Sequence, residues 1–242
     1  MIELIHINKS FGHHQVLHEV TFTFEDGKVY GIVGENGAGK TTLFRCIAGL
    51  ETASGKINAS LQPLKNHLGY LTSDPYFLSK ITGEEYIYLL TDARRKKIQN
   101  LSERNIFELP LKEYASSYST GMKKKLALTA TLLQDNSFYI LDEPFNGIDL
   151  QSSIILTEII LRLKAMDKTI LISSHIFSTL KDTCDEILVL EEGRISKSVR
   201  KEHFGDFEEE MKELTLETRR EQSRIRSKRY RERQKRKQLY AV

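Results

Sequence analysis

The residues from Gly34 to Thr41 have the types and the spacing of a phosphate-binding loop. They read Gly-Glu-Asn-Gly-Ala-Gly-Lys-Thr, which matches the pattern G-x-x-x-x-G-K-[ST] between an apolar run and a helical pattern. Glycines let backbone N–H groups converge on phosphate oxygens, and the start of a helix adds a positive dipole end. Lys40 would reach the β- and γ-phosphates of a nucleotide, and the Thr41 hydroxyl would reach Mg²⁺. The predicted nucleotide-binding residues of the loop are Gly34, Glu35, Asn36, Gly37, Ala38, Gly39, Lys40, Thr41 and Thr42.

Two adjacent acids, Asp142 and Glu143, follow the apolar run 138–141. In a nucleotide hydrolase the carboxyl end of such a strand lies beside the phosphate loop. There Asp142 would hold Mg²⁺ through water, and Glu143 would orient and polarise the attacking water. Two acids on their own more often mark an ordinary strand end. Together with the loop they indicate nucleotide hydrolysis.

Short apolar runs alternate with helical patterns from the N-terminus to about residue 200. The runs are rich in Ile, Val, Tyr and Phe and are bounded by Gly, Asp and Ser, as is typical of strands. Two of them, 138–141 and 169–172, are continuously apolar, which indicates strands buried on both faces of a parallel sheet. The predicted strands are Met1–Ile7, Val20–Phe24, Val29–Val33, Gly55–Ala59, His67–Leu71, Phe138–Leu141, Lys168–Ser173 and Glu186–Leu190.

Helices are expected between these strands, and the alternation favours a doubly wound α/β fold. The stretch from Ser73 to Gln134 has helical patterns but no good strand, so we expect a helical subdomain inserted into the α/β core. We therefore predict one domain over residues 1–205, with the insertion at about 73–134, and a charged, basic tail over 206–242. The predicted helices are Thr41–Ala48, which Gly49 would terminate, Gly83–Ala93, Gly121–Leu133 and Leu150–Ala165.

The composition is that of a globular chain with a sizeable core. Of 242 residues 40% are hydrophobic, and no apolar stretch approaches the roughly 20 residues that a membrane span needs. The start, Met-Ile-Glu-Leu-Ile-His, has an acid at position 3 and no basic flank, so we expect a first strand and no signal peptide. Two cysteines, Cys46 and Cys184, argue against a disulfide framework, and we expect both to be small buried hydrophobic residues.

The net charge of +3 hides an asymmetry between the ends of the chain. Residues 219–237 hold eleven Lys and Arg against two Glu, a local charge of +9, so the rest of the chain carries −6. Such a block is usually disordered or weakly helical and solvated. Attraction to an anionic membrane leaflet is a sharper alternative, at about 1 kcal/mol per basic residue near the surface. Nucleic-acid binding also stays open, because phosphate contacts need no sequence reading.

Four motifs together resemble an ATP-binding cassette (ABC) ATPase. Three are the loop, the run Leu141-Asp-Glu-Pro144 and the pair Ser174-His175. The fourth is the family's signature, of type L-S-G-G-Q, for which this chain has Tyr-Ser-Thr-Gly-Met at 118–122. Ser119 and Gly121 keep their places, and the variant is similar to the ATPases of bacterial drug- and antibiotic-type exporters. The resemblance covers residues 1 to about 200 and implies a P-loop NTPase fold with a parallel sheet, an antiparallel β portion and an inserted helical subdomain.

The resemblance also implies roles for residues outside the loop. Two cassettes of this family pair head to tail, and each ATP lies between one subunit's loop and the other's signature, here Ser119 and Gly121. His175 would touch the γ-phosphate and the attacking water, beside Glu143. Asp149 would belong to the loop that crosses the dimer interface, and Phe11 would stack on adenine. A core aromatic side chain is the alternative for Phe11, and a simple helix N-cap is the alternative for Ser119.

One position departs from the family pattern. A Gln that reaches Mg²⁺ and the water normally ends the strand predicted at 67–71, and this chain has Ser73 at the expected place. A Ser hydroxyl is a shorter and weaker ligand, so metal binding or coupling to a partner would be altered. The predicted metal ligands are therefore Thr41, Asp142 and Ser73. We expect the lysines at 123–125 to form a solvated face rather than a ligand set.

The sequence thus predicts the ATP-binding and hydrolysing subunit of an ABC transporter, with ATP and Mg²⁺ as its cofactors. We expect it to act as a homodimer through the ATP sites and to drive a separate integral membrane permease, in export, from the cytoplasmic side of the membrane. A contact of the basic tail with anionic lipid is expected as well. One alternative is a non-transport ABC ATPase that acts on nucleic acid or ribosomes, although such relatives usually carry two cassettes or a long coiled coil. Another is a regulatory nucleotide-binding module without turnover, against which Lys40, Asp142 and Glu143 count.

Overall fold

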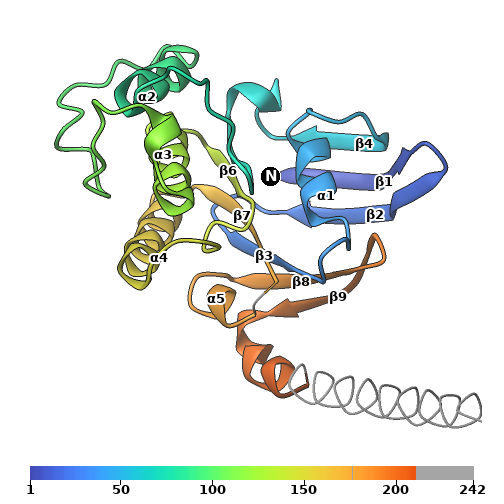
Figure 1. Ribbon diagram of the computed structural model, residues 1–242. Helices are drawn as coiled ribbons and strands as arrows, with labels where there is room; N and C mark the ends of the chain where they lie inside the picture. The colour runs from blue at the N-terminus through green and yellow to red at the C-terminus, as the bar shows by residue number, and fades with distance from the viewer. Residues whose placement is uncertain (176, 211–242) are drawn as a thin grey trace, which may run out of the picture. The chain divides into compact units, whose positions relative to one another are not determined.

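The computed structural model of the protein describes residues 1–175 and 177–210 (Figure 1). The chain divides into two compact units, Met1–Lys201 and Glu202–Val242. The strands and the helices longer than one turn described below belong to the first unit. The basic run at 219–237 lies outside the described residues, and the predicted domain limits at 205/206 and 73–134 stay predictions.

A six-stranded sheet forms the centre of the first unit, in the order β5-β6-β7-β3-β8-β9. Every neighbouring pair up to β8 is parallel, and all residues of β3, β6 and β7 are buried. Burial of 138–141 and 169–172 confirms the prediction from their apolar runs. The carboxyl ends of β3, β6 and β7 therefore meet at one edge of the sheet. The strands are β3 (Val29–Val33), β5 (Leu68–Leu71), β6 (Phe138–Leu141), β7 (Thr169–Ser174), β8 (Glu186–Glu191) and β9 (Arg194–Arg200).

The last strand of this sheet, β9, pairs antiparallel with β8 and is not among the strands predicted above. Its sequence is Arg-Ile-Ser-Lys-Ser-Val-Arg, and most of its side chains are exposed. Charged side chains on an edge strand protect its unpaired backbone groups from association with another chain. They also remove the apolar pattern by which a strand is recognised.

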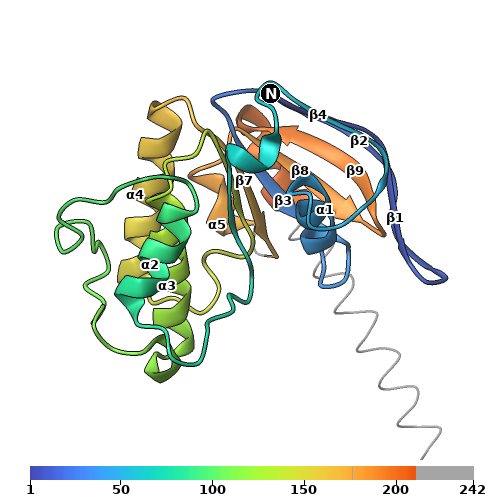
Figure 2. The same cartoon turned by 90° about the horizontal axis from the view of Figure 1, so that it is seen from above.

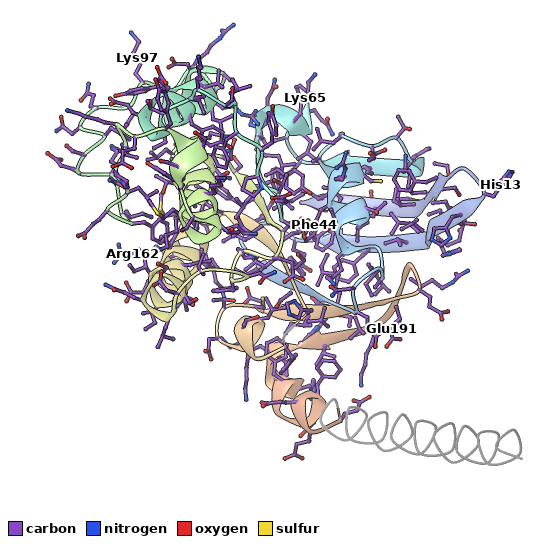
Figure 3. All side chains as sticks on the ribbon, viewed as in Figure 1. His13, Phe44, Lys65, Lys97, Arg162 and Glu191 are labelled. Atoms are coloured by element: carbon purple, nitrogen blue, oxygen red, sulfur yellow. The ribbon has the colours of Figure 1, made fainter. Side chains whose placement is uncertain are left out.

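A second, antiparallel sheet of three strands has the order β2-β1-β4, with β1 (Ile2–Phe11), β2 (His14–Phe24) and β4 (Ser54–Ala59). The first two strands are longer than predicted because they continue into a polar hairpin, at whose tip Figure 3 shows His13. Helix α1 (Lys40–Ile47) packs between the two sheets, and its Phe44 is fully buried in their shared core (Figures 2 and 3). This core holds the phosphate loop, which lies between β3 and α1, against both sheets.

Helices α2 and α3 lie away from the antiparallel sheet, and Figures 1 and 2 show them side by side. Thr82 caps α2 in a capping box with Glu85, whose N–H donates to the Thr82 hydroxyl oxygen at 3.2 Å. Among the described residues, no helix is long and apolar enough to cross a membrane. The helices are α2 (Gly83–Asp92), α3 (Thr120–Leu132), α4 (Leu150–Ala165), α5 (Ser178–Lys181) and the 3₁₀ turns Leu64–Asn66, Ala115–Ser117 and Lys201–His203.

The α/β class, the parallel sheet and the antiparallel portion are as predicted. The bounds of β3, β6 and α4 agree residue for residue with the expectation, and the short helix α5 is an addition to it. Gly49, with φ of 72°, donates its N–H to the Cys46 carbonyl and ends α1 as predicted. Both cysteines are buried free thiols, also as predicted.

Candidate functional site

The loop between β3 and α1 is shaped by glycines that no other residue could replace without strain. Gly37 and Gly39 have φ of 91° and 105°, a region that side chains with a Cβ rarely adopt. A Cβ at Gly34 would lie 2.3 Å from the Leu190 carbonyl oxygen, so the loop fits against β8 only with glycine there. Gly39 is the N-cap of α1, and the loop therefore leads into the positive end of that helix.

The ammonium group of Lys40 lies inside this loop. The residue is 7% exposed, and its Nζ donates to the carbonyls of Gly34 at 2.6 Å and Glu35 at 3.1 Å. Its Nζ also lies 3.9 Å from Oε1 of Glu143. A buried ammonium needs such partners because desolvation disfavours its charge. The loop therefore keeps a cation close to the position where phosphates would bind.

A hydrogen-bond network joins the loop to the end of β6. The Thr41 hydroxyl donates to Oδ2 of Asp142 at 2.7 Å, and the Ser173 hydroxyl donates to Oδ1 of the same carboxylate at 2.5 Å. Asp142 itself is fully buried. The parallel pairing of β6 with β7 places Ser173 next to it. Ser173 is a site residue that the sequence does not reveal, because a Ser at the end of an apolar strand belongs to no recognisable motif.

Glu143 occupies a strained position between two basic groups. Its φ of 49° is left-handed, which costs a non-glycine residue about 1–3 kcal/mol and is typical of functional sites. The Ser173 hydroxyl oxygen accepts its N–H at 2.8 Å. The Glu143 side chain is 14% exposed, and Nδ1 of His175 lies 3.0 Å from its Oε2. Lys40 approaches the other carboxylate oxygen, Oε1. The carboxylate is thus fixed from its backbone and from both oxygens.

These groups border one cavity of about 620 Å³, a size that suits a nucleotide. The structure therefore brings together the phosphate loop, the acid at the end of β6, the histidine after β7 and the serine after β5. Val16 of β2 and Asn146 are further lining residues. The cavity is lined by Val16, Asn36, Gly37, Gly39, Lys40, Thr41, Thr42, Ser73, Glu143, Asn146 and His175.

Several predicted nucleotide-binding residues are not among the described residues that line this cavity: the loop residues Gly34, Glu35 and Ala38, and Phe11, Ser119, Gly121 and Asp149. Phe11 is 49% exposed at the end of β1, so its alternative as a core aromatic side chain is wrong. The Lys9 ammonium lies 4.7 Å from the centre of its ring, a cation–π contact. The ring is exposed, which stacking on a base requires.

The signature residues lie at the start of α3, beside the loop after β6. Ser119 is the N-cap, and its side-chain oxygen accepts the Met122 N–H at 3.2 Å. A Cβ at Gly121 would lie 2.8 Å from the Gly147 carbonyl oxygen, so the first turn of α3 and the loop after β6 pass in close contact. Asp149 is the N-cap of α4, and its Oδ2 lies 2.6 Å from the Lys125 Nζ. The hydrogen bond from Lys125, together with the one from the Ser152 N–H, lowers the pKa of the Asp149 carboxyl.

The expectation of a solvated lysine face at 123–125 is wrong for Lys124. This residue is 4% exposed, and its Nζ donates to the Ser73 carbonyl oxygen at 2.7 Å. Burial lowers the pKa of its ammonium, while Asp142, Glu143 and Asp74 act in the opposite direction. The side chain of Lys125 is also mostly covered, at 17% exposure. Three consecutive lysines read as surface, and only the packing of α3 shows that one of them points inward.

The donor set beside the loop fits a magnesium ion that is shared with phosphates. Mg²⁺ is usually held by one or two carboxylates together with substrate phosphates. The Thr41 hydroxyl and the Asp142 carboxylate already meet at 2.7 Å, and Ser73 lines the same cavity as Thr41. Among the described residues, no group of three or more His, Cys, Asp and Glu could hold a metal without such additional ligands.

The comparison with known families agrees with this geometry. The family model described as "ABC transporter" matches residues 17–146, which include the loop and the acidic strand end. The chain belongs to the ABC transporter family. It is an ATP-binding subunit with the P-loop NTPase fold, an ATPase that binds ATP.

Individual ABC relatives and structures support the same assignment. The chain is 34% identical over 190 residues to an uncharacterized ABC transporter ATP-binding protein of Nostoc sp., covering 72% of this chain and 57% of the relative. It is 32% identical over 208 residues to the Nod factor export ATP-binding protein I of Rhizobium meliloti, covering 80% and 62%. A solved structure of an ABC transporter's ATP-binding subunit is 27% identical with a TM-score of 0.73, covering 83% of this chain and 90% of that one. This chain thus spans less than two thirds of the length of both relatives.

Proposed function

We propose that this ABC ATPase works as a head-to-tail dimer that drives export through a separate membrane permease, bound to it on the cytoplasmic side of the membrane. The observation that carries the proposal is the division of the predicted site within one chain. The loop, Glu143 and His175 border one cavity, whereas Ser119 and Gly121 are not among the described residues that line it. A second cassette would bring its own signature to the open side of that cavity. The exposed N–H groups at the start of α3 suit a γ-phosphate.

In the proposed reaction, Glu143 orients and polarises the water that attacks the γ-phosphate, and His175 contacts both. The hydrogen bond between their side chains at 3.0 Å supports this pairing. Lys40 binds the β- and γ-phosphates and leaves the loop carbonyls that it now contacts. Positioning and charge stabilisation supply most of the catalysis in phosphoryl transfer, because the protein has little covalent chemistry to perform.

We propose Thr41, Asp142 and Ser73 as the residues that hold Mg²⁺. When bound, the metal would help to neutralise the negative charge that develops on the phosphates. Asp142 is fully buried and fixed by Ser173, so its carboxylate is preorganised. The Ser73 side chain is shorter than that of the Gln that the family usually has there, so its hydroxyl would be the weaker ligand of the set.

The export direction rests on two supports. The signature variant is similar to that of drug-type exporters, and the Rhizobium relative is an export ATP-binding protein. The permease partner follows from the family, in which ATP-binding subunits act on paired membrane domains. The transported substrate would be selected by the permease and not by this chain.

Mixing two inactive variants tests the head-to-tail dimer. Lys40→Ala removes the phosphate contact, and Ser119→Asp keeps an N-cap residue for α3 but places a carboxylate where the partner's γ-phosphate would bind. We expect each variant alone to lack turnover and the mixture to regain it, because a mixed dimer has one site with an intact loop and an intact signature. Steady-state phosphate release is the measurement, and Ser119→Thr, which keeps the hydroxyl, is the control. A mixture as inactive as its components would contradict the arrangement.

We further propose that the basic run at 219–237 contacts anionic lipid and is dispensable for hydrolysis. Its local charge of +9 stands against −6 for the rest of the chain. We expect full-length protein to sediment with phosphatidylserine vesicles but not with phosphatidylcholine vesicles. Binding should weaken as salt rises, since the Debye length is only about 8 Å at physiological salt.

The lipid proposal is tested by comparing the full-length protein with a protein truncated after Thr218. The truncated protein should lose sedimentation with anionic vesicles and keep its ATPase activity. Loss of activity would instead make the tail part of the fold or of the dimer. If the full-length protein does not bind anionic vesicles but binds DNA or RNA in a salt-dependent way, the ligand of the basic run is nucleic acid and not lipid.

A further inference from the structure

Lys124 is a buried cation for which the roles proposed above give no reason. The residue lies in the second turn of α3 and is 4% exposed. Among the described residues, the buried lysines are Lys9, Lys40 and Lys124. Burial of an ammonium is unfavourable unless charges or hydrogen bonds compensate it. The buried ammonium of Lys124 therefore depends on neighbouring groups that stabilise its charge.

The partners of this ammonium belong to the reaction centre. Its Nζ donates to the Ser73 carbonyl oxygen at 2.7 Å. Asp142, Glu143 and Asp74 are the acids whose charges favour its protonated form. Lys40 approaches Glu143 from the phosphate loop, so the charges of two lysines from different elements act on this one acid.

The hydrogen bond joins two segments that are far apart in the sequence. Ser73 follows β5, at the point where the chain leaves the parallel sheet, and is one of the residues that line the cavity. Lys124 follows the N-cap of α3, Ser119, by five residues. The Ser73 hydroxyl reaches only as far as its backbone allows, since a serine side chain has a single rotatable carbon–carbon bond. Fixing the carbonyl of Ser73 therefore fixes the region that the hydroxyl can reach.

We propose that Lys124 is a positioning residue for ATP hydrolysis, which holds the Ser73 carbonyl so that the Ser73 hydroxyl stays at the cavity beside Asp142 and Glu143. The same bond links this hydroxyl to the start of α3, where the signature lies. A shift of α3 is thereby transmitted to the place where phosphate and water react. This inference rests on the proposed roles of Ser73 and Glu143.

The test compares Lys124→Met with Lys124→Arg and Lys123→Met in the full-length protein. Methionine keeps the length and the apolar stem but cannot donate, whereas arginine can still donate to a carbonyl. We expect Lys124→Met to lower kcat by about 10- to 100-fold, the cost of a misplaced group, with the KM for ATP within about twofold of wild type. Lys124→Arg should recover most of the rate. Lys123→Met removes the same charge one position earlier and should leave kcat near that of wild type.

A double-mutant cycle with Ser73→Ala separates positioning from general stability. Ser73→Ala keeps the backbone carbonyl and loses only the hydroxyl that Lys124 is proposed to position. Lys124→Met should therefore lower kcat much less in the Ser73→Ala background than in the wild type, because coupled residues are not additive. Thermal unfolding and the Kd of ATP, measured by calorimetry, show whether each variant folds and binds.

Three outcomes would overturn the inference: an unchanged kcat in Lys124→Met, a Lys124→Arg variant as slow as Lys124→Met, or full additivity with Ser73→Ala. Glu143→Gln is measured in parallel. If that variant keeps turnover, the proposed role of Glu143 is wrong, whatever the Lys124 variants do. If Glu143→Gln is inactive and Lys124→Met is not, only the positioning role is wrong.

Discussion

Glu143→Gln is expected to lower kcat by about 10²- to 10⁴-fold, the usual contribution of a general base, while ATP binding is retained. The amide keeps the size of the side chain but cannot accept a proton from water. The phosphate loop is unchanged, because the Lys40 Nζ contacts the carbonyls of Gly34 and Glu35 more closely than it contacts Glu143. Steady-state phosphate release and calorimetric ATP titration are the two measurements.

ATP should also hold the Glu143→Gln variant as a dimer, because closure on ATP no longer leads to hydrolysis and reopening. Gel filtration with and without ATP measures this. Glu192→Gln is a matched control: Glu192 is also left-handed, with φ of 45°, but it lies in the exposed turn between β8 and β9. It should keep normal turnover. Normal turnover in Glu143→Gln itself would remove Glu143 from the reaction.

The parts of the fold that the sequence predicts are those in which local pattern and final environment agree. Val29–Val33 and Phe138–Leu141 are uniformly apolar and end up buried on both faces, so their bounds are predicted to the residue. Leu150–Ala165 has a capping Asp149 before it and a long helical pattern. In each case the signal comes from the residues themselves and needs no knowledge of the rest of the chain.

The missed parts are those in which tertiary context decides. Strand β9 is an edge strand whose side chains are mostly polar, and only its pairing with β8 makes it a strand. The outer part of the β1–β2 hairpin is polar for the same reason and extends both strands beyond the predicted apolar runs. Edge positions tolerate and favour charge, so hydrophobic patterning underestimates their length.

The same distinction between local pattern and tertiary context applies to the residues of the candidate site. The phosphate loop and the two acids are recognisable because their chemistry needs residues at fixed spacing, and the parallel topology brings them together as expected. Ser173 forms hydrogen bonds with Asp142 and Glu143, 31 and 30 residues away, and Lys124 forms one with Ser73, 51 residues away. Such distant pairs leave no local pattern. For Lys124 the sequence was misleading, because a run of lysines is usually solvated.

Lys40→Ala is expected to weaken ATP binding by about 10- to 100-fold, as loss of a charge-assisted hydrogen bond implies. Lys40 is 7% exposed and is the cation that lines the cavity within the described residues. Removal of its ammonium leaves the phosphate charge to backbone N–H groups and to the helix dipole. The Kd of ATP, measured by calorimetry, gives the effect directly.

The choice of nucleotide shows whether Lys40 acts where the loop predicts. Because Lys40 would contact the β- and γ-phosphates, the Kd of AMP should change much less than the Kd of ATP in the Lys40→Ala variant. Lys168→Ala is the control, since Lys168 is also mostly covered but binds Asp135 at 3.0 Å and does not line the cavity. It should bind ATP as wild type does. Equal losses for AMP and ATP would mean that Lys40→Ala collapses the loop, and an unchanged Kd of ATP would refute the phosphate contact.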